Sequence, residues 1–145
     1  MNVNQKGSIG LIETIRDLTK KGYECFTPMH DYSPVDLIVM DSAFKTFRLQ
    51  VKYRELFRGI IEVNFRSMVN GKAKAIDMNA IDGWAVYCPE VESVVYVSKH
   101  EVDLTKGGFA FRLTEGKNSV NKDKVKRKVY MEYGDLAEWP KAAGC

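Results

Sequence analysis

The sequence predicts an α/β (α+β) fold, in which one mixed β-sheet core is flanked by helices and carries an added β-hairpin. Three observations support this fold class: a helical apolar pattern near the N-terminus, a series of short strand patterns after it, and an Asn70-Gly71 dipeptide between alternating stretches. The chain has 145 residues, of which 45% are hydrophobic and 11% aromatic, and this is enough to bury one core. We therefore expect a single domain over residues 1–145.

The first expected element is a helix from Ser8 to Lys21, which Gly22 would end. Its apolar residues recur at steps of three, and they are expected to form the buried face: Ile9, Ile12, Ile15 and Leu18.

Three strands are expected next, over residues 23–28, 35–41 and 45–55. The second is nearly continuous in apolar residues, which is typical of a buried strand, whereas the third alternates. One face of the third strand is apolar (Phe47, Leu49, Val51, Tyr53). The other face is polar and cationic (Arg48, Gln50, Lys52, Arg54).

A β-hairpin is expected over residues 57–76, with its turn at Asn70-Gly71. A cationic two-stranded hairpin can enter a DNA major groove. The basic residues expected on it are Arg58, Arg66, Lys72 and Lys74. Two core strands at 84–88 and 93–98 and a short strand at 109–113 should follow. Residues 121–128 are expected to form a loop or a short exposed helix.

The net charge of +3 is unevenly distributed along the chain. Residues 45–74 and residues 106–128 each hold eight Lys or Arg and two acids, so the rest of the chain carries a charge of −9. Concentrated basic segments favour a face that binds a polyanion such as DNA or RNA, because clustered cations release counterions when they meet phosphates. The alternative is an ordinary solvated surface.

Targeting signals and cysteine chemistry are not indicated. No apolar run approaches the roughly 20 residues needed to cross a bilayer, and the polar start MNVNQKGS lacks the order of a signal peptide, so we expect a cytoplasmic protein without membrane contact. Cys25, Cys88 and Cys145 lie far apart, which suggests neither a disulfide framework nor a zinc site.

Three polar residues on two successive strands suggest phosphodiester chemistry. Asp36 opens the strand at 35–41, and Gln50 and Lys52 lie on one face of the next strand. Magnesium-assisted cleavage needs oxygen ligands for the metal and a cation near the attacked phosphate. If the two strands are neighbours, these side chains converge. Taken singly, Asp36 is more typical of a turn, and Gln50 and Lys52 of the wet face of a strand.

The segments SPVDLIVMD and RLQVKYRE resemble the signature of the PD-(D/E)XK nuclease superfamily. Pro34 and Asp36 match its first element with Val35 inserted, Gln50 stands where Asp or Glu is usual, and Lys52 matches its lysine. Three other segments are similar to the bacterial group I intron-encoded homing endonucleases of that superfamily: KGSIG at 6–10, DGWAVYCPE at 82–90 and FAFRLTEGKNSVNK at 109–122.

The resemblance implies a restriction-endonuclease-like core that hydrolyses both strands of a long DNA target with Mg²⁺, in a homo-oligomer that is expected to be a tetramer. The implied metal ligands are Asp36, Gln50 and the backbone carbonyl of Val51. The residues expected to contact double-stranded DNA are Arg54, Arg58, Arg66, Lys72, Lys74, Lys117 and Lys122.

Two departures from the family pattern point to a weakened or inactivated form. Gln50 is neutral, so the site loses one negative charge. Leu11 stands where the family commonly has a catalytic Glu after its KG-x-x-G start, and Glu13 faces nearly the opposite way on a helix. The alternative for Leu11 is an ordinary core residue that widens the apolar stripe.

Three functions stay open on the sequence. The first is a site-specific homing endonuclease, and the second is a Holliday-junction resolvase, which shares the helix start and the order of motif residues. The third is a DNA-binding protein without cleavage, which Leu11 and Gln50 favour.

Overall fold

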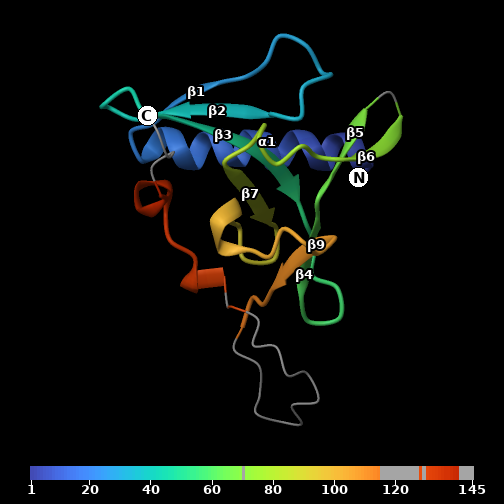
Figure 1. Ribbon diagram of the computed structural model, residues 1–145. Coiled ribbons are helices and arrows are strands. Elements are labelled where there is room, and N and C mark those ends of the chain that lie inside the picture. The colour runs from blue at the N-terminus through green and yellow to red at the C-terminus, as the bar shows by residue number, and fades with distance from the viewer. Residues whose placement is uncertain (70, 115–127, 129, 141–145) are drawn as a thin grey trace.

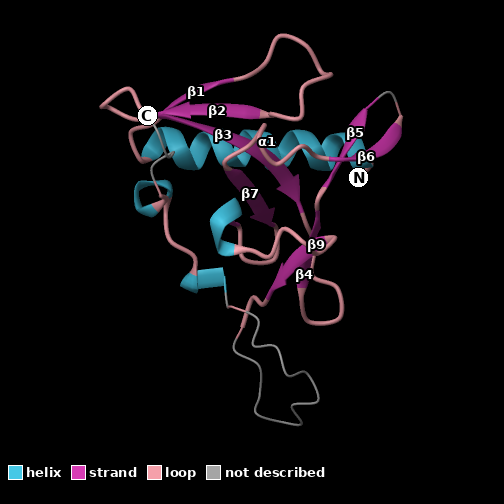
Figure 2. Ribbon diagram, in the orientation of Figure 1, coloured by secondary structure: helices cyan, strands magenta, loops and turns pink. Residues whose placement is uncertain are grey.

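The computed structural model describes residues 1–69, 71–114, 128 and 130–140, and its centre is a five-stranded mixed sheet (Figures 1 and 2). The strand order is β1-β2-β3-β7-β8, with the β3–β7 pair parallel and the other pairs antiparallel. The sheet strands are β1 (Glu24–Phe26), β2 (Leu37–Met40), β3 (Thr46–Tyr53), β7 (Gly83–Cys88) and β8 (Ser93–Ser98). This mixed sheet confirms the fold class expected from the sequence.

One α-helix, α1 (Val3–Lys20), lies along one face of the sheet in the described part of the chain (Figure 1). The other helical elements described are single 3₁₀ turns: η1 (Lys99–Glu101), η2 (Tyr130–Glu132) and η3 (Leu136–Glu138). Among the described residues, no helix is long and apolar enough to cross a membrane.

The helix α1 begins five residues earlier than expected because Asn2 and Gln5 form a capping box, each side chain accepting the other's backbone N–H at 2.9 Å. Its buried face is Gly10, Thr14 and Leu18. Ile12 is 61% exposed, so its assignment to the apolar stripe was wrong. A strict three-residue repeat drifts around a helix, whereas steps of four and three stay on one face.

Two apolar cores lie on the two faces of the sheet. The α1-side core joins Leu18 of the helix to Leu37, Leu49 and Ala85 of the sheet, and Trp139 closes it beside the helix. The second core lies under β7 and contains Trp84, Phe65 and Phe111. Gly83 is required here because a Cβ at this position would collide with the Val97 carbonyl and the Trp139 ring.

The expected hairpin over residues 57–76 is divided in two. Its first stretch splits at Phe65 into β4 (Ile61–Asn64) and β5 (Arg66–Val69), and β4 pairs with the distant β9 (Gly108–Phe111). Only β5 and β6 (Lys72–Ala75) form a hairpin, in which Val69 pairs with Lys72. Arg58 lies outside it, in a separate tight turn closed by Phe57 and Ile60.

Candidate active site

Asp36 is held against β3 by two hydrogen bonds at the point where β2 begins. Its backbone N–H donates to the Leu49 carbonyl at 2.9 Å, and the Val51 N–H donates to its Oδ2 at 2.8 Å. Asp36 therefore precedes β2 rather than forming part of it. Its carboxylate accepts the Val51 N–H, which has no backbone acceptor on β2 at this position.

Gln50 and Lys52 lie on the sheet face opposite α1. Leu49 and Val51 pack into the α1-side core, and alternation along β3 turns their neighbours to the other face. Leu37 pairs with Leu49, so Asp36 lies across from Gln50. The structure thus brings the three residues of the motif to one end of the β2–β3 pair.

This face of β3 is not the wet surface that its polar sequence suggested. Gln50 is only 3% exposed, and Lys52 and Arg54 are partly buried. Arg48 is bound to Asp82, with Nε donating to Oδ2 at 3.3 Å and Nη2 to Oδ1 at 3.1 Å. Arg48 thereby secures the segment that leads into β7, and part of the positive charge of residues 45–74 is already neutralised.

Lys52 reaches from the site to the base of the hairpin, where its Nζ donates to the Arg66 carbonyl at 2.9 Å. Burial and, to a smaller extent, the nearby Arg54 lower the pKa of Lys52 to about 8, whereas Asp36 acts in the opposite direction. Burial also lowers the pKa of Arg54. The site therefore contains a lysine that is easily deprotonated near neutral pH.

The Asp36 carboxyl has a raised pKa, because burial opposes its ionised form more than its neighbours support it. The Val51 N–H and the Lys52 charge act against this rise. A partly desolvated acid and a partly desolvated lysine, close enough to influence each other, are the combination expected of a reactive site.

We expect Lys52→Met to stabilise the metal-free protein. The folded pKa of about 8 lies below the unfolded value of 10.5, so the folded state disfavours the charged lysine. Removing that charge should raise the free energy of unfolding by roughly 1–3 kcal/mol at pH 7. Above pH 8 the unfolded chain binds more protons than the folded one, so the advantage of the variant should shrink as pH approaches 10.5.

The measurement is denaturant unfolding of the parent and the variant between pH 6.5 and about pH 10, followed as a difference so that other titrations cancel. Lys72→Met is the matched control, because Lys72 is exposed and its variant should show no such trend. An unchanged or larger gain at high pH would contradict the burial of a charged Lys52.

Three oxygens at this point fit a hard divalent cation. Asp36 supplies a carboxylate, and Gln50 supplies an amide oxygen, Oε1, which is buried and has no hydrogen-bond partner in the described structure. The Val51 N–H points to the Asp36 edge, and the carbonyl of a strand residue points to the same edge as its N–H. Since β2 pairs with β3 only from Leu37 onward, that carbonyl lies beyond the paired region.

This donor set fits Mg²⁺, which prefers carboxylate and carbonyl oxygens. It contains only one carboxylate. No group of three His, Cys, Asp or Glu side chains able to hold a metal occurs in the described residues. The affinity of such a site therefore depends on Asp36 and on how well the two neutral oxygens are oriented.

Leu11 has the surroundings of a core residue. It is half-buried and packs against the α1-side core, which includes Leu37 and Leu49. Gln50 and Lys52 point to the other face of the sheet. These neighbours favour the packing role for Leu11, and its correspondence to a catalytic acid stays a prediction.

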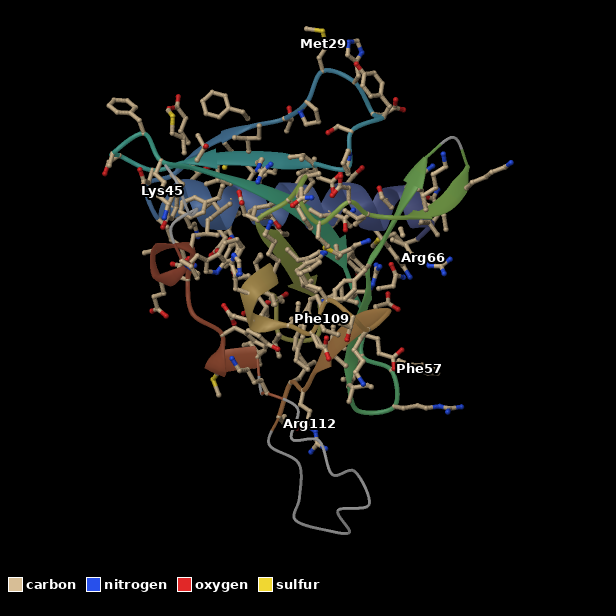
Figure 3. All side chains as sticks on the ribbon, viewed as in Figure 1. Met29, Lys45, Phe57, Arg66, Phe109 and Arg112 are labelled. Atoms are coloured by element: carbon tan, nitrogen blue, oxygen red, sulfur yellow. The ribbon has the colours of Figure 1, made fainter. Side chains whose placement is uncertain are left out.

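The basic residues of the hairpin do not share one face. Arg66 pairs with Ala75, whereas Lys72 and Lys74 pair with Val69 and Ser67. Directly opposed residues lie on the same face of a ribbon, so Arg66 and the two lysines lie on opposite faces. Figure 3 shows Arg66 at the base of the hairpin. Lys117 and Lys122 lie outside the described residues, as do residues 121–127 of the expected loop or helix.

Two features of the site were missed on the sequence. The Arg66 carbonyl is a backbone acceptor, and Trp84 is the register partner of Gln50 on β7. Neither depends on a motif. The DGWAVYCPE segment marked β7 as a core strand, but only the observed register places Trp84 beside Gln50.

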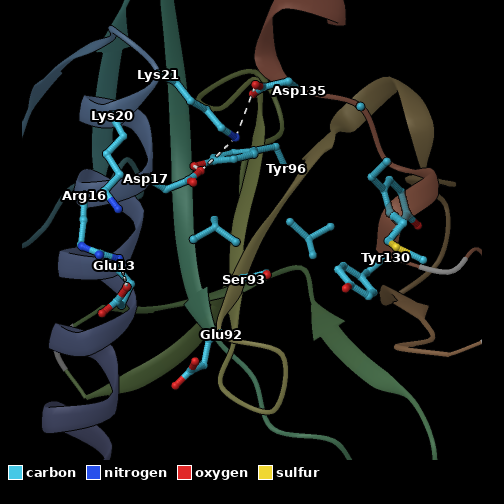
Figure 4. A pocket seen from close by; sticks show the side chains of 15 residues that line it. Glu13, Arg16, Asp17, Lys20, Lys21, Glu92, Ser93, Tyr96, Tyr130 and Asp135 are labelled. Atoms are coloured by element: carbon cyan, nitrogen blue, oxygen red, sulfur yellow. Dashed lines mark hydrogen bonds and ion pairs between the residues drawn. The ribbon is translucent and has the colours of Figure 1, made fainter.

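A separate polar cavity of about 350 Å³ lies between α1, β8 and residues 130–135 (Figure 4). Tyr96 donates to Asp17 at 2.6 Å, and Lys21 bridges Asp17 and Asp135 at 3.0 and 3.4 Å. Burial, together with the bond to Asp17, raises the pKa of the Tyr96 hydroxyl. These paired groups fasten the C-terminal segment to the helix, and they lie on the α1 side of the sheet, away from Gln50.

The mixed sheet gathers an aspartate, a glutamine and a lysine at one end of the β2–β3 pair. The sequence model described as PD-(D/E)XK endonuclease matches residues 1–131, and the chain belongs to this family. Among curated proteins, no match is found.

A solved structure with a similar fold is that of the bacterial homing endonuclease I-Ssp6803I. The two share a TM-score of 0.65 and 18% sequence identity, over 92% of this chain and 88% of that chain. At this identity the likeness concerns the fold, and it supports the mixed-sheet architecture described above.

Proposed function

We propose that the protein is a Mg²⁺-dependent homing endonuclease that recognises a long double-stranded DNA site and hydrolyses both strands. The observation that carries the proposal is the assembly of Asp36, Gln50 and Lys52 at the end of the β2–β3 pair. This assembly is joined by the Lys52–Arg66 hydrogen bond to an exposed basic hairpin. Membership of the endonuclease family and the fold of I-Ssp6803I support it.

In this proposal Asp36, Gln50 Oε1 and the Val51 carbonyl hold the metal, and Lys52 lies beside the scissile phosphate. When bound, Mg²⁺ supplies Lewis acidity at a phosphate oxygen and lowers the pKa of coordinated water. Lys52 in its protonated form offsets the negative charge that develops on the phosphate, and in its neutral form it accepts a proton from water. Arg54, which directly follows β3, adds a phosphate contact at the edge of the site.

The two faces of the hairpin should make different DNA contacts. Arg66→Ala should relax preference at one or two base pairs, by roughly 1–3 kcal/mol, if its guanidinium reads a guanine edge. Lys72 and Lys74 lie on the other face. Lys72→Ala and Lys74→Ala should each weaken binding about equally on all DNA sequences and lower the slope of log affinity against log salt concentration by about 1.

The measurement is affinity for matched and mismatched duplexes at several salt concentrations. A uniform loss in Arg66→Ala would make Arg66 a phosphate contact. Sequence-dependent losses in the lysine variants would reverse the assignment of the two faces.

The target site can be obtained by selecting bound fragments from a random duplex library at moderate salt, which suppresses nonspecific phosphate binding. Selected duplexes are then incubated with the protein and Mg²⁺, and sedimentation of the complex gives the number of subunits. We propose a homotetramer, so that two active sites can serve the two strands while further subunits extend the contact with a long target. Failure to cut any selected duplex with Mg²⁺ would contradict the nuclease proposal.

A second candidate is a DNA-binding protein that no longer cleaves. It is favoured by the apolar surroundings of Leu11 and by a donor set with a single carboxylate. It predicts tight, sequence-specific binding that Mg²⁺ does not convert into cleavage.

A further inference from the structure

Two buried polar atoms on neighbouring strands lack partners, and they are of complementary kinds. In the described structure, neither Gln50 Oε1 nor Trp84 Nε1 has a hydrogen-bond partner. An amide oxygen accepts hydrogen bonds, and an indole N–H can only donate. Leaving either group buried and unsatisfied destabilises the folded protein, so each needs a partner.

The sheet register places these residues side by side. Gln50 pairs with Trp84 across the parallel β3–β7 ladder, and paired residues of neighbouring strands, about 4.8 Å apart, point to the same face. Gln50 is 3% exposed and Trp84 0% exposed. Bulk water is therefore excluded from both.

Two phenylalanine rings hold the Trp84 indole in place. The Trp84 ring stacks on Phe65 with ring centroids 5.1 Å apart, and Phe109 approaches it at 5.0 Å. Phe65 directly precedes Arg66, whose carbonyl accepts the hydrogen bond from Lys52. The same aromatic rings therefore support the strand that positions Lys52 and the ring that lies beside Gln50.

We propose that Trp84 is a positioning residue: its Nε1–H and Gln50 Oε1 share one bound water, which orients the amide oxygen toward the metal site. The oxygen and nitrogen of an amide are nearly identical in size, so packing alone does not decide which end faces the site. The water accepts the indole N–H and donates its own hydrogen to the oxygen, which keeps a second lone pair for Mg²⁺. An orienting donor matters more for Gln50 than for a carboxylate, which offers an oxygen in either orientation.

The first test is the indole N–H resonance in ¹⁵N-labelled protein, which does not require activity or a known target. Trp84 and Trp139 give separate signals, assigned with Trp84→Phe. Gln50→Glu should move the Trp84 signal downfield, because a carboxylate is a stronger acceptor, and Gln50→Leu should move it upfield. Trp139 is the internal control, because its Nε1 is also buried without a partner but lies on the α1 side of the sheet.

The second test is calorimetric titration with Mg²⁺. Trp84→Phe should weaken Mg²⁺ binding by about 10-fold or more, as losses of orienting partners do at other metal sites, whereas Trp139→Phe should leave it unchanged. Melting temperatures establish that each variant is folded. If a Gln50 variant does not fold, the Trp84 signal is followed in the parent protein during Mg²⁺ addition, and it should move more than that of Trp139.

The proposal rests on the metal site of the proposed function, and the two fail differently. Absence of Mg²⁺ binding in the parent protein would contradict the proposed function, and Gln50-dependent shifts of the Trp84 signal would still support the hydrogen bond. Normal Mg²⁺ binding with Trp84 and Trp139 signals that move alike, or not at all, would overturn the positioning role of Trp84.

Discussion

Asp36→Asn should abolish Mg²⁺-dependent cleavage while leaving the fold and DNA binding largely intact. Asparagine has the same shape, and its Oδ1 can still accept the Val51 N–H that holds residue 36 against β3. The substitution removes a negative charge, because Asp36 supplies the only carboxylate among the proposed metal ligands. We expect a loss of roughly 100-fold or more in turnover and a change in DNA affinity within about threefold.

Lys52→Ala should also lower turnover more than affinity, because it removes a charge that acts on the reacting phosphate. The matched control is Asp41→Asn, since Asp41 caps the turn after β2 through Ala43 and Lys45 and lies outside the site. The measurement is the rate of cleavage of a selected duplex, with each substitution made in a parent protein that cleaves this duplex with Mg²⁺. Parent-like rates in both Asp36→Asn and Lys52→Ala would show that the chemistry occurs elsewhere.

The site residues could be predicted because their placement depends on short-range rules. Alternation in β3 is enough to put Gln50 and Lys52 on one face, and a turn before β2 brings Asp36 to the same strand end. Burial could not be predicted in the same way. The polar face of β3 looked solvated, but Gln50 on it is buried, and Lys52 reaches the Arg66 carbonyl on a segment outside the sheet.

The errors in the fold have the same origin. β4 was assigned to the hairpin because its alternation is local, whereas its true partner β9 lies more than 40 residues downstream. The helix start could have been predicted from Asn2 and Gln5, which form the capping box. The three-residue apolar repeat instead placed Ile12 on the buried face. The pairing of Gln50 with Trp84 depends on register between β3 and β7, which no local pattern determines.

Leu11→Glu should separate the packing role of Leu11 from the role of a lost catalytic acid. Leu11 packs against the α1-side core and is half-buried. A glutamate there would place a charge among apolar groups, so we expect the free energy of unfolding to fall by about 1–3 kcal/mol and cleavage to stay unchanged.

Leu11→Gln is the matched control, since it has the same length and polarity without the charge. Melting temperature and cutting of a selected duplex with Mg²⁺ are measured on both variants. An unchanged melting temperature and a rise in cleavage of orders of magnitude, in Leu11→Glu and not in Leu11→Gln, would contradict the packing role. That result would mean that a carboxylate from α1 reaches the metal end of the β2–β3 pair, and that the single-carboxylate site is a natural inactivation that one substitution reverses.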